Sequence, residues 1–410
     1  MATRMWYNHR MDFDSVVDRS GTYSLKWDNP KNRPGRPDII PLWVADMDFP
    51  PPEGVLEAIR ARAAHPIYGY TRVPPEFAEA VARWYAARQG LELEPGEIFM
   101  AASVMSALAA ALRCFTTEGG GVMIMPPVYH PFYSVVEENK RALVEAPLAR
   151  DAELTWRMDF ERMDEAAKAA ERAGIPIQAI LVSSPHNPVG RVWTRNELEE
   201  LLDFTRSRGA VLLCDEIHSD IILGDRKFLS MAAVAGADES GILVFSGPNK
   251  TFNIAGLHIC QVIARHEPTR ASMKKAIAAH YLGEPNAFAL AAALAAYRDG
   301  GPWLDALLAY LRGNKDYLEG FLTARLPGIR PGRLEGSYLA WLDARELLAG
   351  RGLGQDEGPL VVDLEERARV KLSPGSLFGK EGEGFLRLNL ACPRSILAEG
   401  LERVARMIGR

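Results

Sequence analysis

The sequence of 410 residues predicts an α/β protein, with a large domain built on a mostly parallel central sheet and a smaller α+β domain. Between about residues 95 and 265, short apolar runs alternate with amphipathic helical segments, which is typical of this class. The runs show little polar alternation, as expected of parallel strands that helices cover on both faces. After Pro327 the pattern changes to a mixture of strands and helices, which indicates the second domain.

Six apolar runs are expected to form strands of the large sheet. In chain order they are EIFMAA (97–102), GVMIM (121–125), QAILVSS (178–184), AVLLCDE (210–216), GILVFSG (241–247) and CQVIA (260–264). Helices are expected between them. One should begin after Thr194, because Glu197 follows it with capping-box spacing. Near residues 286–323 the pattern predicts two helices, interrupted at Gly300-Gly301-Pro302.

These elements suggest three regions. Residues 1–50 are expected to be an N-terminal segment that packs with the small domain, and residues 51–300 the large, cofactor-binding domain. Residues 301–410 should hold a connector helix and the small C-terminal α+β domain, with SYLAWLDA (337–344) and GFLRLNLA (384–391) among its segments.

Composition narrows the classes of partner. The net charge of −5 comes from 48 basic and 53 acidic residues without a block of like charge, so neither nucleic acid nor a membrane surface is expected as a partner. No stretch of about 18 apolar residues predicts a membrane span, and the N-terminus lacks the apolar core of a signal peptide. The four cysteines are widely spaced without a CxxC pair, so a reducing cytoplasm is the expected location. The expected partner is a small molecule.

Polar residues follow three of the predicted strands. Asn187 lies in PHNPVGRVW after the third run, Asp215 ends the fourth, and Ser246 and Lys250 follow the fifth. Ligands of α/β sheets gather beyond the carboxyl ends of the strands, so these side chains are expected to meet in one crevice. Each of them alone is more often a helix cap or a solvated charge, but the ordered set is specific.

A lysine, a carboxylate and an amide together suit pyridoxal phosphate. The lysine forms a Schiff base with the cofactor, and an acid keeps the pyridine nitrogen protonated so that the ring accepts electrons. Asp215 fits the acid. Asn187 fits a donor to the phenolic oxygen, with Pro188 holding its loop in a cis peptide, and Ser246 is placed to bind the phosphate. No metal is expected, and HExxH, GxxxxGK[ST] and GxSxG motifs are absent from the sequence.

The motifs resemble those of a known family. SSPHNPVGRVW, DEIHSD, SGPNKTFNIAGL and GFLRLNLACPRS are similar to motifs of fold-type I, aminotransferase-like pyridoxal-phosphate enzymes of class I/II. PLWVADMDFP, HPIYGYT, PPVYHPFYSVVEENKR and GEPNAF resemble its cystathionine β-lyase, or C–S lyase, subfamily. The resemblance extends from about residue 5 to residue 409.

The resemblance implies roles at the cofactor. Lys250 becomes the Schiff-base lysine and the base that moves the substrate Cα proton, Asp215 the partner of the pyridine nitrogen, and Asn187 the phenolate donor, which also adjoins the substrate. Tyr129 is implied to stack on the ring, although its residue type alone favours a core aromatic. His218 is implied to lie near Asp215, and a structural histidine fits that position almost as well.

The resemblance also implies a substrate site and a second subunit. Arg387 matches the arginine that binds the substrate α-carboxylate bidentately, with Ala45 beside it as a further substrate-binding residue. Tyr70 matches a tyrosine that reaches the phosphate held by the neighbouring subunit, which implies a homodimer with shared sites.

Three positions depart from the family pattern. Ser103 stands where a glycine is usual in the phosphate-binding turn, before Val104 and Met105, although backbone N–H groups at a helix N-terminus bind phosphate whatever the side chain. Pro248-Asn249 precedes the lysine in place of small residues. His258 stands where many aminotransferases have a phosphate-binding arginine, which agrees with the lyase subfamily.

The predicted reaction is β-elimination from cystathionine or a related cysteine thioether, releasing thiol, pyruvate and ammonia. A thiolate leaves readily because the pKa of a thiol is low. An aminotransferase is the alternative, but no second arginine stands in a motif position to bind a keto-acid partner. A regulatory or binding protein on the same fold is a further alternative, against which Lys250, Asp215 and Arg387 argue.

Overall fold

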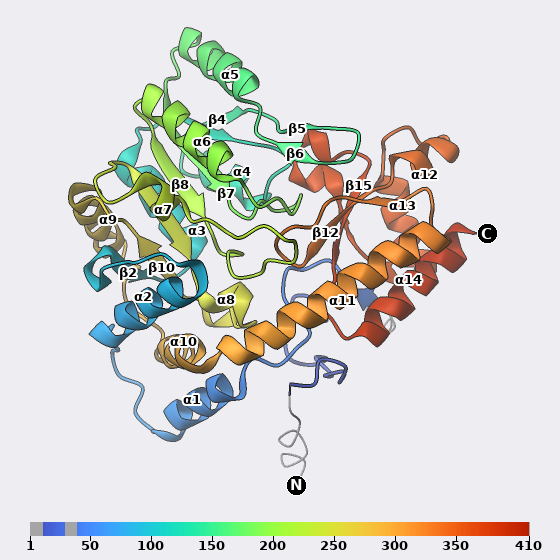
Figure 1. The fold of residues 1–410 in the computed structure, drawn as a ribbon, viewed down its shortest axis with the longest axis horizontal. Coiled ribbons are helices and arrows are strands. Elements are labelled where there is room, and N and C mark those ends of the chain that lie inside the picture. Colours follow the sequence, from blue (N-terminus) through green and yellow to red (C-terminus); the bar gives the residue numbers. More distant parts are fainter. Residues whose placement is uncertain (1–10, 29–38, 410) are drawn as a thin grey trace.

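The computed structural model describes residues 11–28 and 39–409, and its larger sheet has seven strands, which lie in the left half of the view in Figure 1. The strands lie in the order β2-β10-β9-β8-β7-β3-β4, and only β10 runs antiparallel to its neighbours. Their bounds are β2 Ile98–Ala101, β3 Gly121–Ile124, β4 Ala142–Glu145, β7 Ile177–Ser183, β8 Val211–Asp215, β9 Ile242–Ser246 and β10 Cys260–Ile263. The predicted α/β class is confirmed.

All six predicted runs contain a strand of this sheet. The seventh strand, β4, was not predicted because it lies at the edge of the sheet, and its residues are less buried than those of the central strands. The parallel strands β7, β8 and β9 end side by side, with Ser183 in register with Asp215, and Asp215 in register with Phe245. The carboxyl ends of these three strands are therefore aligned, so the residues that follow them start from the same edge of the sheet.

Helices cover both faces of this sheet, and the last helices of the chain lie beside the C-terminal strands instead (Figure 1). They are α1 Glu53–Ala64, α2 Pro75–Gln89, α3 Val104–Phe115, α4 Pro131–Glu137, α5 Phe160–Arg172, α6 Arg195–Ser207, α7 Met231–Ala235, α8 Pro248–Thr251, α9 Glu267–Ala279, α10 Ala287–Asp299, α11 Gly301–Arg325, α12 Arg345–Gly350, α13 Gly358–Asp363 and α14 Arg394–Ile408. The predicted capping box of α6 is present: the Thr194 hydroxyl accepts from the Glu197 N–H, and the Glu197 carboxylate accepts from the Thr194 N–H.

The predicted interruption between two helices is also present, between α10 and α11 at Gly300. A Cβ there would lie 2.3 Å from the Phe252 ring and 2.4 Å from the Ala296 carbonyl, so the close approach requires glycine. Figure 1 shows α11 running from α10, beside the large sheet, to α14 beside a second sheet. None of the described helices is long and apolar enough to cross a membrane.

The second sheet is antiparallel, in the order β11-β12-β15-β14. Its strands are β11 Arg330–Pro331, β12 Leu339–Asp343, β14 Ser373–Pro374 and β15 Phe385–Asn389. Two short pairs lie outside both sheets: β1 Ile40–Pro41 is parallel to β13 Val370–Lys371, and β5 Ala149–Arg150 is antiparallel to β6 Trp156–Arg157.

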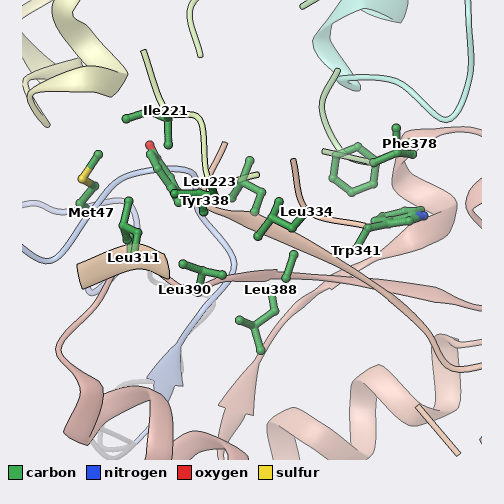
Figure 2. Close-up of a cluster of buried hydrophobic side chains, with 14 of the residues drawn as sticks. Met47, Ile221, Leu223, Leu311, Leu334, Tyr338, Trp341, Phe378, Leu388 and Leu390 are labelled. Atoms are coloured by element: carbon green, nitrogen blue, oxygen red, sulfur yellow. The ribbon is translucent and has the colours of Figure 1, made fainter. Parts of the chain in front are cut away.

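The loop formed by residues 42–49 lies between the two sheets. Its Leu42 carbonyl accepts from the Asn389 N–H, and its Asp48 N–H donates to the Ala391 carbonyl. Figure 2 shows Met47 of this loop near Leu311 of α11 and Tyr338, in an apolar cluster with side chains of the second sheet. Of the predicted N-terminal segment 1–50, residues 1–10 and 29–38 lie outside the described residues.

Candidate active site

Lys250 lies on α8, immediately beyond the carboxyl end of β9. Its Nζ donates to the Ala45 carbonyl at 2.6 Å, which joins the lysine to the loop 42–49. Burial lowers the pKa of Lys250 to about 8, and the nearby Asp46 carboxylate opposes that shift. About a tenth of this amine is therefore neutral at pH 7, far more than for a solvated lysine, and the neutral form acts as nucleophile and base.

Asp215 ends β8, next to this lysine. Its Oδ1 accepts from the Ile217 N–H at 3.1 Å, and burial raises the pKa of Asp215 to about 7 against the opposing charge of Lys250. His218 is also buried, and burial lowers its pKa to about 3, so that its imidazole is neutral. Asp215 is thus a desolvated acid that an additional cationic or N–H partner would ionise.

Arg387 of β15 faces the same crevice from the second sheet. It is only 4% exposed, yet it forms no ion pair with a carboxylate of the described residues. It donates to Asn187 Oδ1 at 3.1 Å and to the Trp43 carbonyl at 3.0 Å, while its Nε is buried and has no partner in the part of the chain that the structure describes. Burial lowers the pKa of Arg387 to about 10. A buried cation with unused donors is suited to bind an anionic group.

The structure therefore brings Lys250, Asp215, Asn187 and Arg387 to one place, as the strand ends predict. The Asn187–Pro188 peptide is cis, as predicted. Tyr129 lies within electrostatic range of Asp215 and Arg387, and burial raises its pKa. Ala45, predicted to bind the substrate, lies at the same place, where its backbone carbonyl accepts from Lys250; its role at a substrate stays a prediction.

The expected phosphate turn forms the N-terminus of α3. Ser103 is its N-cap, and the Ser103 hydroxyl accepts from the Ser106 N–H at 3.1 Å. The N–H groups of Val104 and Met105 lie in the first helical turn, where no intrahelical acceptor exists. Ser246 is buried, and its hydroxyl donates to the Glu216 carbonyl at 3.0 Å rather than pointing its proton at the crevice. Its role at a phosphate stays a prediction.

Tyr70 is not part of this cluster within one chain. Its side chain is fully exposed, in the loop between α1 and α2. Ile67 and Tyr68 of the same loop are also exposed, although the Tyr68 ring packs against Phe288 and its hydroxyl donates to the Ala63 carbonyl.

A cavity of about 610 Å³ adjoins Lys250 on the side of the N-terminal segment. Its lining includes Arg19, Ala45 and His258, the residue that stands where many aminotransferases have a phosphate-binding arginine. His258 is exposed and has a positive backbone φ of 55°. Residues 17–25 form the outer wall.

The family model described as aminotransferase class I and II matches residues 37–404. The chain belongs to this family. Cystathionine β-lyase PatB of Bacillus subtilis is 37% identical over 394 residues, which cover 96% of this chain and 99% of that protein. Protein MalY of Escherichia coli is 34% identical over 392 residues, covering 95% and 97% of the two chains.

Solved structures of the family agree in fold. Cystalysin from Treponema denticola, whose structure contains a pyridoxal 5'-phosphate cofactor, superposes with a TM-score of 0.88 at 30% identity, covering 97% of this chain and 98% of that one. A pyridoxal-phosphate-bound C–S lyase from Staphylococcus hominis gives 0.89 at 28% identity, covering 98% and 100%. The predicted resemblance to aminotransferase-like fold type I and to C–S lyases is confirmed.

Sequence reasoning missed several groups that shape this aminotransferase-family site. Trp43 contributes a carbonyl to Arg387, and the Phe378 ring lies 4.6 Å from the guanidinium carbon. The Tyr338 hydroxyl donates to the Ala45 carbonyl at 3.0 Å. A backbone carbonyl is supplied by any residue type, so the role of Trp43 left no sign in the sequence except that it lies in PLWVADMDFP, the motif segment that also holds the predicted residue Ala45.

Proposed function

We propose that the protein is a pyridoxal-phosphate-dependent C–S β-lyase that acts on cystathionine or a related cysteine thioether. The observation that carries the proposal is the meeting of a lysine of lowered pKa, Lys250, with a buried arginine that no carboxylate of the described residues pairs, Arg387. Lys250 can react as an amine, and Arg387 can bind the α-carboxylate of a substrate. Membership of the family and the lyase names of its relatives support the same conclusion.

The residues present fit the cofactor. Lys250 offers a neutral amine to an aldehyde, and Asp215 a buried acid that a protonated ring nitrogen would ionise. Asn187 is held near them by its bond to Arg387, Tyr129 is close to Asp215, and the first turn of α3 offers N–H groups to a phosphate. Pyridoxal phosphate supplies an electron sink for the carbanion formed at the substrate Cα.

The side chains of this chain then have distinct tasks. Arg387 binds the α-carboxylate, and the Trp43 carbonyl and Asn187 hold the guanidinium in orientation. Lys250 accepts the Cα proton, which requires the neutral amine that its pKa of about 8 makes accessible. The Cβ–S bond breaks with the electron pair leaving on sulfur, because a thiolate is a stable leaving group.

Arg19 bears on the alternative of transamination. It is the arginine that the structure places in the cavity beside Lys250, where a second carboxylate of a keto acid would need a cation. Its guanidinium is already engaged by Asp46 and Asp48, at 2.7 Å each. A saturated arginine is poorly suited to that task, which supports elimination over amino transfer.

The exposed loop supports a homodimer with shared sites. Tyr70, Ile67 and Tyr68 present large apolar side chains to solvent in a single chain. Contiguous exposed apolar surface marks a site of protein association. We propose that Tyr70 contributes to the site of a second copy of the chain, at its phosphate.

One panel of assays tests the function. The purified protein, supplied with pyridoxal phosphate, is incubated with cystathionine and with simpler cysteine thioethers, and pyruvate and thiol are measured together. The same amino acids are offered with 2-oxoglutarate or pyruvate, and amino transfer is measured. Pyruvate and thiol in equal amounts support the lyase. Amino transfer faster than thiol release would replace it with a transaminase, and no reaction with either panel would contradict both.

A further inference from the structure

Two asparagines hold the loop 42–49 in place, and each of them closely follows one of the two functional cations in the chain. Asn389 lies two positions after Arg387 on β15, and Asn253 lies three positions after Lys250. Their side-chain amides bind backbone groups of the loop. The loop is thereby attached to both segments that carry the cations.

Asn389 binds the loop on both sides of Ala45. It is 1% exposed, and its Nδ2 donates to the Val44 and Asp46 carbonyls, each at 2.6 Å. Its Oδ1 accepts from the Ala391 N–H at 2.8 Å, which fixes the orientation of the amide. A peptide unit is planar and turns only about the bonds at its ends. Because the carbonyls before and after position 45 are both held, the Ala45 carbonyl has little freedom to turn.

Asn253 ties the other end of the loop to the segment of Lys250. Its Oδ1 accepts from the Met47 N–H at 2.9 Å, and its Nδ2 donates to the Met47 and Phe49 carbonyls at 3.0 and 2.7 Å. Its backbone has a positive φ of 54°, a conformation that asparagine tolerates better than most residues. The loop is therefore bound to the Lys250 segment at one end and to β15 in its middle.

Carbonyls next to these attachment points bind the functional cations. The Ala45 carbonyl accepts from Lys250 Nζ at 2.6 Å, and the Trp43 carbonyl accepts from Arg387 at 3.0 Å. A neutral amine that donates to a fixed acceptor also has its lone pair directed, and that lone pair takes the proton. The loop thus sets the base relative to the guanidinium that would hold the substrate carboxylate.

We infer that Asn389 and Asn253 are positioning residues for the transfer of the Cα proton. They fix the loop 42–49, and the loop fixes Lys250 relative to Arg387. The inference rests on the proposed lyase function, because it needs a substrate held at Arg387 and a proton that moves to Lys250. Each asparagine acts through the backbone of the loop and not on the reacting atoms.

Asn389→Ala and Asn253→Gly test the inference in the holoenzyme. Glycine adopts a positive φ readily, so Asn253→Gly removes the amide without backbone strain and serves also if Asn389→Ala folds poorly. We expect kcat for pyruvate release from the best thioether of the assay panel to fall by about 10²-fold in each variant, since a displacement of about 1 Å costs that much. The primary isotope effect on kcat, measured with substrate deuterated at Cα, should be at least as large as in the wild type, because proton transfer is the step that is slowed.

Asn314→Ala is the matched control. Asn314 is fully buried, and its Nδ2 also donates to two carbonyls that lie two residues apart, those of Leu390 and Cys392, at 2.8 and 2.9 Å. Those carbonyls lie outside the loop 42–49. Asn314→Ala should lose as much stability to urea as Asn389→Ala, yet keep the wild-type kcat and isotope effect. A wild-type kcat in the test variants, an isotope effect smaller than that of the wild type, or an equal fall of kcat in the control would overturn the inference and leave the lyase function intact.

Binding of 3-(methylthio)propanoate gives a readout that does not depend on cleavage. This acid has the carboxylate and the thioether of S-methylcysteine but no amino group, so Arg387 can hold it without any reaction at the cofactor. We expect its dissociation constant, measured by NMR titration of the holoenzyme, to rise by about tenfold in Asn389→Ala, because the Trp43 carbonyl no longer orients the guanidinium, and to stay unchanged in Asn314→Ala. If no thioether yields pyruvate, the proposed function fails and this comparison alone decides the role of Asn389. Equal dissociation constants, or no binding by the wild-type protein, would then overturn it.

Discussion

Replacing Arg387 by methionine should lower the rate of thioether cleavage strongly while leaving the free energy of unfolding nearly unchanged. Methionine has a similar length and no charge, so Arg387→Met removes the guanidinium and leaves the volume largely filled. If the guanidinium grips an α-carboxylate bidentately, two charge-assisted hydrogen bonds are lost, each worth about 1.5–3 kcal/mol. The loss of about 3–6 kcal/mol predicts that kcat/KM for thioether cleavage falls by about 10²-fold to 10⁴-fold.

The free energy of unfolding should change little in the same variant. Burial lowers the pKa of Arg387 to about 10, so at neutral pH, where the folded and unfolded states are both protonated, burial of the charge costs about 3 kcal/mol. That cost disappears only as the pH rises above the folded-state pKa of about 10 toward the ordinary pKa of arginine. Methionine removes the cost together with the bonds to Asn187 and Trp43, which are worth about 1.5 kcal/mol each, so the two changes nearly cancel.

The measurements are pyruvate release and urea unfolding, with Arg191→Met as the control. Arg191 is equally buried, but it forms ion pairs with Glu197 and Glu335. Its loss breaks both ion pairs at once, although Glu335 keeps Arg226 and Glu197 keeps the Thr194 N–H, and should cost about 3 kcal/mol of stability. If Arg387→Met were destabilised as strongly as the control, or if its kcat/KM stayed within a factor of ten of the wild-type value, Arg387 would be a structural arginine.

Four further outcomes are expected. Lys250→Ala should abolish the borohydride-reducible cofactor linkage; a reduced peptide labelled at another lysine would contradict the assignment. Asp215→Asn should retain the cofactor but lose roughly 10²-fold or more in kcat, since an unprotonated ring is a poor electron sink. Mixed dimers of inactive Tyr70→Phe and inactive Lys250→Ala chains should regain activity, and hybrids as inactive as their parents would refute shared sites. In the protein without cofactor, acetylation of Lys250 should rise through pH 8, because its pKa lies near 8 rather than 10.5; a rise only near pH 10 would refute the neutral amine.

Much of the fold could be predicted because burial on both faces of a parallel sheet leaves a direct signature. The runs that became β7, β8 and β9 are apolar almost without interruption, and they place Asn187, Asp215 and Lys250 by chain position alone. The direction of β10 left no such signature, because an antiparallel strand covered on both faces carries the same residues as a parallel one.

The rest of the site depends on backbone atoms and on contacts between distant segments. The Ala45 carbonyl meets Lys250, 205 positions away in the chain, and any residue at position 45 would supply the same oxygen. Arg19 was not predicted either, because its partners Asp46 and Asp48 become neighbours only when the N-terminal segment folds onto the loop 42–49. Such contacts are set by tertiary packing, which a local pattern does not encode.

Buried arginines of this protein show how a functional charge is distinguished from a structural one. Arg191 and Arg387 are 3% and 4% exposed, so burial alone does not separate them. Arg191 has two carboxylate partners, and its charge is balanced within the fold. Among the described residues Arg387 has an amide oxygen and a carbonyl as its partners and no carboxylate, so its charge is unbalanced near Lys250, whose pKa is lowered by burial and further by this arginine. Two buried cations that repel each other are tolerated at a site that binds an anionic ligand. The bound anion then supplies the negative charge that neutralises them.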